Sequence, residues 1–281
     1  MASGTPTAAL VALLEHAPAA VSRDREQLRQ ERGAEAILER KLGLFASAAI
    51  ADAEARLKEW RSRGWTVVSV LDDEYPCLLR GTADAPPLLF VAGEVRAGDR
   101  RAVAVVGSRR PTERGCSLAA DLTCCLAAAG YTVVSGLAAG IDTVVHRAAL
   151  GSGGRTIAVI GNGFEHCYPP QNAGLQRQIE RDGAVVSQFL PSTRPSRRSF
   201  PTRNAVMSGL TVATVIVEAS ATSGTRTQAR SALSQGRRVL LMEGLLVNDW
   251  ARDLAGRVGV DVLGSPAAAV GALESRGPVA A

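Results

Sequence analysis

Six short apolar runs recur along the chain, and helical segments separate them. The runs are continuous rather than alternating and contain many β-branched residues: "AVAVVG", "YTVVSG", "TIAVIG", "AVVSQF", "VATVIVEA" and "RRVLLM". Such runs are typical of parallel strands that are buried on both faces. The intervening segments, such as "PTERGCSLAADLTCCLAAAG" and "GTRTQARSALSQG", have the length of helices and end at glycine. This alternation predicts an α/β fold with a Rossmann-like, doubly wound, mainly parallel sheet.

The chain divides into three regions. Residues 1–64 contain charged, alanine-rich segments with helical periodicity that stop at Gly64, so we expect a small helical N-terminal region. Residues 65–265 carry the strands and helices of the Rossmann-like domain. Residues 266–281 are rich in alanine, glycine and proline, and we expect a C-terminal tail there.

The composition disfavours several classes of protein. No apolar run approaches the length of a membrane span, and the N-terminus lacks the pattern of a signal peptide, so we expect a cytoplasmic protein without a membrane partner. The five cysteines are odd in number and have no CxxC spacing, which argues against a disulfide framework and a zinc site. We expect reduced thiols, no cofactor and no metal.

One segment is strongly basic. The stretch "STRPSRRSFPTRN" (192–204) holds four arginines and one phenylalanine but no acidic residue, in a chain of net charge +5. The segment is either a solvated linker or a loop that binds phosphates.

In a fold of this type, ligands bind where strands end and helices begin, because loop amides and helix N-termini meet there. Five loops lie at that edge, "GSRRPTERG", "SGLAAGID", "GNGFEHCYPPQN", "SFPTRN" and "EASATSGTRTQAR", and all of them except "SFPTRN" contain glycine. These loops, with Arg109 and Arg203, favour an anion site, although some glycines could serve packing alone. Neither GxGxxG nor GxxxxGK[ST] occurs, which disfavours a standard dinucleotide or Walker site.

At these loops the chain resembles the DNA-processing protein A family (DprA, also called Smf). The motifs "AVVGSRRPTERG", "TVVSGLAAGIDTVVHRAAL", "TIAVIGNGFEHCYPPQN", "SFPTRNAVMSGL", "VIVEASATSGT" and "ALSQGRRV" occur in the family's order, over roughly residues 65 to 245. The resemblance implies a homodimer that binds single-stranded DNA and loads a RecA-type recombinase during natural transformation.

The resemblance also implies roles for single residues. Arg109 corresponds to an arginine that meets a DNA phosphate, and Arg197 to a basic position implicated in DNA binding. Phe200 would pack beside a base or, alternatively, anchor its loop in the core. With the glycine-rich loops, the predicted DNA- or phosphate-binding residues are Gly107, Ser108, Arg109, Arg110, Gly136, Gly140, Gly161, Gly163, Arg197, Arg198, Phe200, Arg203, Asn204, Ser223 and Gly224.

The chain departs from the family pattern at three positions. Ala139 and Ala205 stand where basic residues are usual, and Gln228 replaces a threonine. Fewer phosphate contacts predict weaker binding and a smaller dependence on salt, unless Arg110, Arg198 and Arg226 compensate. We also expect a compact member, without the C-terminal winged-helix-like domain and with at most an abbreviated N-terminal sterile-alpha-motif-like domain.

Asp142 and His146 are four residues apart and share one helix face, as an acid/base pair or half of a metal site would. The other histidines, His16 and His166, lie in different segments, so no metal cluster is predicted. In the family, "GIDxxxH" is a structural hallmark, and the resemblance therefore implies that Asp142 caps its helix and that His146 packs. We predict no catalytic residue.

Two classes of function remain. The first is a non-enzymatic mediator that binds single-stranded DNA, which the arginines of residues 194–203 favour. The second is a nucleotide-sensing or nucleotide-cleaving domain in phage defence or a toxin–antitoxin pair, with a nucleotide ligand or a toxin partner, which Ala139 and Ala205 favour. Glu218 could act as an acid there, but the PGGxGTxxE stretch of phosphoribohydrolases of related fold is absent.

Overall fold

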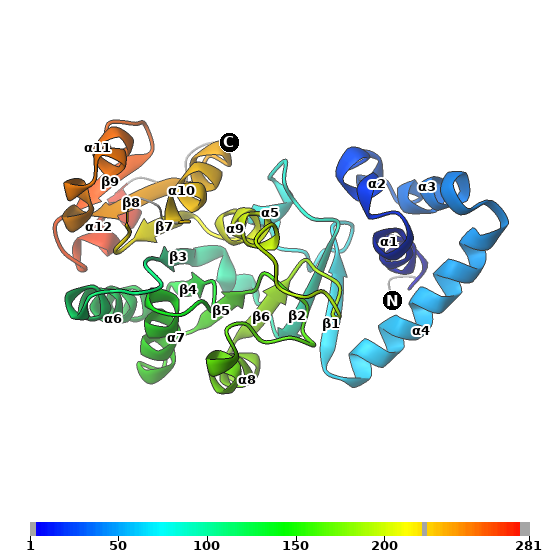
Figure 1. Cartoon of the computed structure of the whole chain (residues 1–281), viewed down its shortest axis with the longest axis horizontal. Coiled ribbons are helices and arrows are strands. Elements are labelled where there is room, and N and C mark those ends of the chain that lie inside the picture. The colour runs from blue at the N-terminus through cyan, green and yellow to red at the C-terminus, as the bar shows by residue number, and fades with distance from the viewer. Residues whose placement is uncertain (1–3, 221–223, 276–281) are drawn as a thin grey trace.

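The computed structural model describes residues 4–220 and 224–275. Its N-terminal part is helical and lies at one end of the molecule (Figure 1). It comprises α1 (Gly4–His16), α2 (Pro18–Arg23), α3 (Gly33–Leu42) and α4 (Ala46–Ser62), with short 3₁₀ turns η1 (Gln27–Arg29) and η2 (Gly43–Phe45). The centre of α1, Ala8 to Leu13, is completely or almost completely buried against α3 and α4.

The described strands form one nine-stranded sheet in the order β1-β2-β6-β5-β4-β3-β7-β8-β9. The strands β3 to β9 pair in parallel, whereas β1 and β2 extend the sheet antiparallel beside β6. The bounds are β1 (Trp65–Ser69), β2 (Leu88–Gly93), β3 (Ala102–Val106), β4 (Thr132–Ser135), β5 (Thr156–Val159), β6 (Ala184–Ser187), β7 (Ala213–Ile216), β8 (Arg238–Met242) and β9 (Val260–Leu263). The strand order reverses between β3 and β7, where such sheets bind their ligands.

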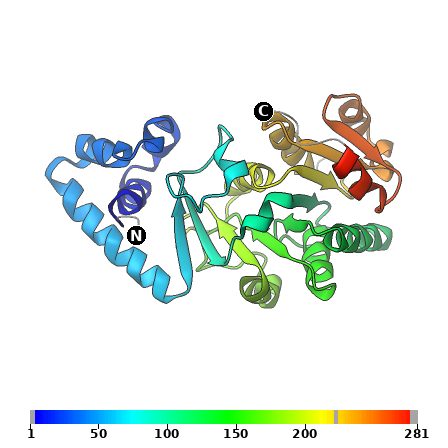
Figure 2. The same ribbon diagram turned by 180° about the vertical axis from the view of Figure 1, so that it is seen from behind.

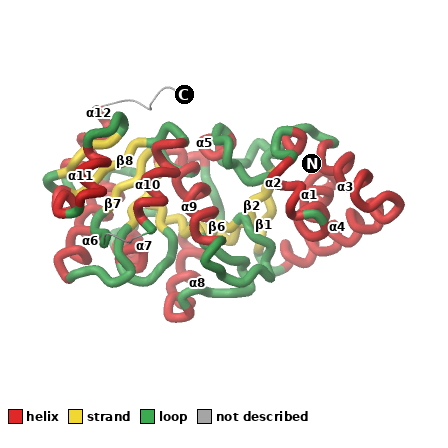
Figure 3. The backbone as a smooth tube through the Cα atoms, turned by 45° about the horizontal axis from the view of Figure 1, so that its top comes forward, coloured by secondary structure: helices red, strands yellow, loops and turns green. Residues whose placement is uncertain are grey.

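Helices cover both faces of the sheet, as the doubly wound fold predicts (Figures 1 and 3). One face carries α6 (Glu113–Ala128), α7 (Ile141–Gly151) and α8 (Ala173–Asp182). The other carries α5 (Cys77–Arg80), α9 (Ser199–Gly209), α10 (Thr225–Ser234) and α11 (Asp249–Ala255). Every side chain of β3 to β8 is buried, which explains why these strands read as continuous apolar runs.

The C-terminal region differs from the expected tail. Residues Ala268–Ser275 form α12, which packs against α6 (Figure 2). The reason is an apolar helix face, because Ala269 is buried and Val270 and Leu273 pack against the same core. No described helix is long and apolar enough to cross a membrane. All five cysteines are free thiols.

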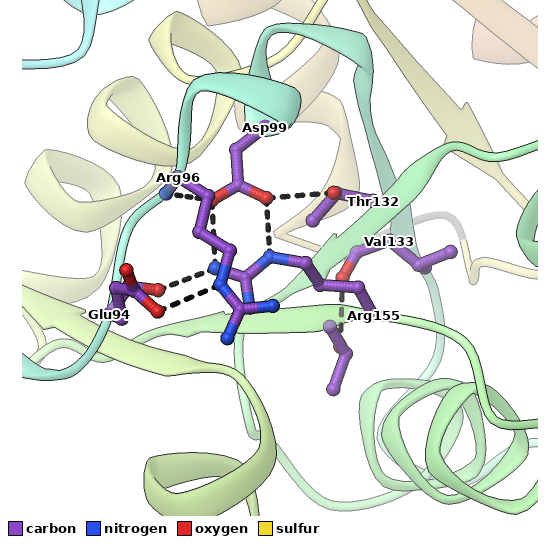
Figure 4. A network of polar contacts seen from close by, with 7 residues as sticks. Glu94, Arg96, Asp99, Thr132, Val133 and Arg155 are labelled. Atoms are coloured by element: carbon purple, nitrogen blue, oxygen red, sulfur yellow. Dashed lines mark hydrogen bonds and ion pairs between the residues drawn. The ribbon is translucent and has the colours of Figure 1, made fainter.

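A buried ion pair holds the amino edge of the parallel sheet together (Figure 4). Asp99, on the 3₁₀ helix η3 (Ala97–Arg101), accepts hydrogen bonds from Arg155 Nε at 2.6 Å, from Thr132 Oγ1 at 2.8 Å and from the Arg96 amide at 2.7 Å. Burial alone disfavours the charged carboxylate. The hydrogen bonds outweigh burial and hold the pKa of Asp99 below its usual value.

We predict that Asp99→Asn lowers the free energy of unfolding by about 2 kcal/mol at pH 7, because Arg155 then lacks a counter-charge. A lowered pKa stabilises the fold above the unfolded-state value of about 4, and this stabilisation is lost as the pH falls through the folded-state value. Urea unfolding between about pH 7 and pH 3 should therefore show the wild type and the variant converging at the acid end. A difference that stays constant over this range would contradict the assignment.

Candidate nucleic-acid interface

A cleft of about 740 Å³ lies beside the carboxyl ends of β3 and β7, at the point where the strand order reverses. The loop after β3, the helix α9 and the start of α10 form most of its wall. Its lining residues are residues 106–110, Ala138, Asp142, Tyr168, Arg197, Phe200, Pro201, Arg203, Asn204, Met207, Ser220, Gly224, Thr225, Thr227 and Gln228.

The structure brings part of the predicted site together in this cleft. Nine predicted residues line it: Gly107, Ser108, Arg109, Arg110, Arg197, Phe200, Arg203, Asn204 and Gly224. Five others are not among its lining residues: Gly136, Gly140, Gly161, Gly163 and Arg198. Ser223 falls outside the described residues.

Arg203 lines the cleft, but most of its side chain is buried, unlike the exposed arginine that the sequence predicts. Its side chain lies on α9, and the residue is only 5% exposed. Nη1 donates to the carbonyl oxygens of Gly136 and Val159, which follow or end the neighbouring strands β4 and β5. Nε donates to Asn204 Oδ1 at 3.1 Å. The guanidinium therefore ties α9 to the sheet beneath the cleft.

The peptide group of Gly136 is held from both sides. Its carbonyl accepts from Arg203, and its amide donates to Asp142 Oδ2 at 3.2 Å. Asp142 also accepts from the Ala138 amide at 3.3 Å. Burial raises the pKa of Asp142 and lowers the pKa of Arg203, whereas the charge of each opposes the shift of the other. Asp142 braces the loop before α7, so the expectation that it caps the helix itself is wrong.

His146 is a packing residue. It is fully buried, and Nδ1 lies 2.8 Å from Thr156 Oγ1, which itself donates to the Val133 carbonyl. Burial lowers the pKa of His146 to about 3, so the ring is neutral at physiological pH. The described residues contain no group of three or more potential metal ligands. His146 thus packs α7 against β5, whereas Asp142 holds the loop before α7, and this arrangement disfavours an acid/base pair.

Four of the predicted glycines are not among the residues that line the cleft, and the protein leaves no room for a side chain at any of them. A Cβ atom would lie 2.3 Å from the Arg203 guanidinium at Gly136, 2.3 Å from the Ser108 carbonyl at Gly140, 2.8 Å from the Phe200 ring at Gly161 and 2.1 Å from the Leu190 carbonyl at Gly163. Gly140 also has a φ of +82°, which disfavours any side chain. At Gly224, by contrast, a Cβ atom meets nothing within 4 Å.

We predict that Gly136→Ala lowers the free energy of unfolding by about 1–2 kcal/mol, because the new methyl group displaces the Arg203 guanidinium from its two carbonyls. Gly224→Ala is the matched control. Its Cβ atom has free space and its φ is −61°, so its unfolding free energy should stay within about 0.5 kcal/mol of the wild type. Equal effects of the two substitutions, measured by urea unfolding, would contradict the packing role of Gly136.

An aromatic and cationic stack forms one side of the cleft. The Phe200 ring is half-buried; the Arg109 guanidinium carbon lies 5.2 Å from its centroid, and the Tyr168 ring centroid lies 5.7 Å away. Tyr168 is 44% exposed. Tyr168 is not among the residues predicted from the sequence, although the aromatic residue before two prolines in "GNGFEHCYPPQN" is a usable signal. The stack offers π-faces and a positive charge at one place.

Exposed arginines surround this stack. Arg109, Arg110 and Arg197 line the cleft, and Arg198 is exposed at the start of α9. None of them forms an ion pair within residues 4–220 and 224–275. Their positive charges remain available to an anion.

Glu218 has a structural partner at the same edge. Its carboxylate accepts from the Thr112 amide at 3.1 Å and from the Thr112 hydroxyl at 2.5 Å, at the N-terminus of α6. A carboxylate at a helix N-terminus is stabilised by the helix dipole. This arrangement disfavours the role of a free catalytic acid that the alternative function requires.

The family model described as "DNA recombination-mediator protein A" matches residues 66–253. This chain belongs to the DNA recombination-mediator protein A family. The match confirms the resemblance on which the sequence analysis relied, and it covers all strands from β3 to β8 as well as the cleft.

Curated relatives agree with this membership. The chain is 35% identical to the DNA processing protein DprA of Bacillus subtilis over 196 residues, which is 69% of this chain and 66% of the relative. It is 42% identical to protein Smf of Escherichia coli over 175 residues, which is 62% of this chain and 47% of the relative. The matched region thus spans about half to two thirds of the relatives' length.

Solved structures share the fold. The X-ray structure of DprA from Streptococcus pneumoniae matches with a TM-score of 0.70 and 30% identity, and covers 97% of this chain and 94% of that one. DprA from Helicobacter pylori, whose structure concerns the single-stranded DNA binding mode of that protein, matches with a TM-score of 0.67 at 23% identity. It covers 75% of this chain and 96% of that one.

Proposed function

We propose that this chain is a recombination mediator that binds single-stranded DNA in the cleft beside Phe200. The observation that carries the proposal is the stack of Arg109, Phe200 and Tyr168 among arginines that form no ion pair within the part of the chain that the structure describes. Guanidinium groups neutralise phosphates, and aromatic faces stack on any base, so such a surface suits single strands without sequence preference.

Exposed arginines partly replace the two family positions that are alanine here. Ala139 is exposed in the loop before α7, and Ala205 is half-buried in α9. Arg110 and Arg198 lie at the same edge and carry the charge that these alanines lack. We propose that the chain keeps the DNA site of the family with a shifted set of phosphate contacts.

The experiment is fluorescence anisotropy of a labelled oligonucleotide with the wild-type protein over a salt series. We expect binding that increases with oligonucleotide length, prefers single over double strands and weakens steeply with salt. Unlabelled mononucleotides are the competitors. Displacement of the oligonucleotide by a mononucleotide at micromolar concentration would favour the nucleotide-sensing alternative, and no binding at low salt would refute the DNA proposal.

Family membership also supports the finer proposal that the DNA-bound protein loads a RecA-type recombinase in the cytoplasm. The relatives are named for DNA processing, and the family for recombination mediation. Recombinase filament formation on DNA coated with a single-stranded DNA-binding protein measures this step. Acceleration by the wild type is the expected result, and no acceleration by a DNA-binding-competent protein would refute the loading step alone.

We propose further that two copies pair at the free edge of β9. No described strand pairs with its outer edge, Val262 is 40% exposed, and Val258, just before the strand, is 99% exposed. An unpaired edge with apolar side chains favours association with another strand.

Val262→Arg is therefore expected to convert a dimer into a monomer at micromolar concentration, because the new charge loses its solvation in the interface. Light scattering coupled to size-exclusion chromatography measures the mass. Leu44→Arg is the control, since Leu44 is 99% exposed on η2 at the other end of the molecule. A monomeric wild type, or a Val262→Arg dimer, would contradict the interface.

A further inference from the structure

A small cavity lies apart from the cleft, on the sheet face that α5 and α9 cover. It encloses about 250 Å³ and shares no lining residue with the cleft. Its residues are Asp73 to Leu78, Val95 to Ala97, Asp99, Arg100, Val134, Ile157, Val186 and Leu210. The cavity therefore has no part in the proposed DNA site.

The floor of the cavity is apolar. Val134, Ile157 and Val186 come from the adjacent strands β4, β5 and β6 and are at most 2% exposed. Tyr75 is also buried, and its hydroxyl donates to the Pro86 carbonyl at 2.7 Å. The tyrosine hydroxyl is thus already engaged. These side chains form the base of the cavity, and the half-buried Leu78 and Val95 supply apolar surface that is accessible above it. An aromatic ring or a branched aliphatic chain suits such a lining.

The mouth of the cavity carries both signs of charge. Asp73 and Glu74, which precede α5, and Arg100 on η3 are all exposed. In the described part of the chain these three residues form no ion pair, whereas the other charged lining residues do. Arg96 pairs with Glu94 at 2.8 Å and Asp99 pairs with Arg155. Two carboxylates and one guanidinium are therefore open to a ligand.

We propose that this cavity binds a free apolar α-amino acid. The side chain fills the apolar floor, the ammonium group faces Asp73 and Glu74, and the carboxylate faces Arg100. A ligand with an apolar body and both charges at one end matches the apolar lining and the mixed charges of the mouth together. A ligand of about a dozen heavy atoms with partly exposed charges should bind with a dissociation constant of roughly 0.1 to 1 mM.

Isothermal titration calorimetry with three probes tests the ligand class. The probes are L-phenylalanine, 3-phenylpropionate, which lacks the ammonium group, and phenethylamine, which lacks the carboxylate. We expect L-phenylalanine to bind at least about threefold more tightly than either relative, because each has lost a contact with an exposed charge. A relative that binds as tightly as L-phenylalanine, or no binding of L-phenylalanine at about 10 mM, would overturn the proposal.

Two variants place the binding in the cavity. Leu78→Trp should fill it and weaken L-phenylalanine binding at least about tenfold. Arg100→Ala should weaken L-phenylalanine about threefold but leave phenethylamine unchanged. Arg147→Ala, an exposed arginine on α7 that does not line the cavity, is the control.

The fold of each variant is checked by its unfolding midpoint and by its affinity for single-stranded DNA, which should match those of the wild type. If Leu78→Trp does not fold, Arg100→Ala still tests the proposal. An equal loss of affinity for L-phenylalanine and for phenethylamine would contradict the assigned orientation of the ligand. If the wild-type protein does not bind DNA, the proposed function is refuted, whereas the proposal that the cavity binds an amino acid still stands.

Discussion

Arg203→Ala is expected to lower the free energy of unfolding by about 3–5 kcal/mol. The side chain is buried, and it supplies the hydrogen bonds of two carbonyl oxygens, those of Gly136 and Val159. Its removal leaves both carbonyls without this donor, removes the positive charge that faces Asp142, and opens a cavity under the cleft. Each of these terms destabilises the folded state.

Urea unfolding measures the effect, and two variants sharpen it. Arg197→Ala removes an exposed arginine from the same basic segment and should change the unfolding free energy by no more than about 0.5 kcal/mol. Arg203→Lys keeps the charge, but its ammonium group lies one bond nearer the backbone than Nη1 and lysine lacks the Nε that donates to Asn204, so it should recover only part of the loss. Equal stability of Arg203→Ala and Arg197→Ala would show that Arg203 is not a scaffold residue.

The triple substitution Arg109→Ala, Arg110→Ala and Arg197→Ala is expected to weaken single-stranded DNA binding about 100-fold at 0.1 M salt. Each lost phosphate contact removes about 0.7 from the slope of log affinity against log salt concentration, so the slope should become shallower by about 2. The three arginines line the cleft and are exposed, so the fold should persist.

The control removes the same charge elsewhere. Arg147, Arg177 and Arg181 are exposed on α7 and α8, which cover the opposite face of the sheet. Their triple alanine variant should keep most of the affinity and slope. If the two triple variants lose affinity equally, DNA follows the overall charge of the protein and not this cleft.

Phe200→Ala separates stacking from charge. The substitution should cost about 1–3 kcal/mol of binding free energy while the salt slope stays that of the wild type, because no phosphate contact is lost. Tyr168→Ala should have an effect of the same kind, since the two rings lie together. Anisotropy over the same salt series measures both quantities.

The sequence predicted the fold well and the site only in part. Six continuous apolar runs became β3 to β8, because a strand that is covered on both faces must be apolar throughout. The strands β1, β2 and β9 were not predicted as part of the sheet. Their place depends on pairing with partners distant in sequence, such as Phe90 with Ser187, and on an exposed edge that needs no apolar pattern.

The residues of the cleft also fall into two groups, those that a local sequence motif predicts and those that only the tertiary structure brings to the cleft. The motifs "GSRRPTERG" and "SFPTRN" led to Arg109, Arg197 and Phe200, all of which line the cleft. Tyr168 was missed because nothing local to its loop brings it to Phe200. The glycines of the loops were correctly placed at the edge of the sheet, but Gly136 and Gly163 face protein atoms and not the open cleft.

By itself, the sequence determined the family, the parallel sheet and the edge at which a ligand binds, because these follow from periodicity and from ordered motifs. Only the tertiary structure decided which arginines meet solvent. Arg197 and Arg203 are six positions apart in one basic segment, yet the first is exposed and the second is buried. The partners of Arg203 lie 67 and 44 residues away, so its burial follows from the packing of α9 on β4 and β5 rather than from its neighbours in the chain.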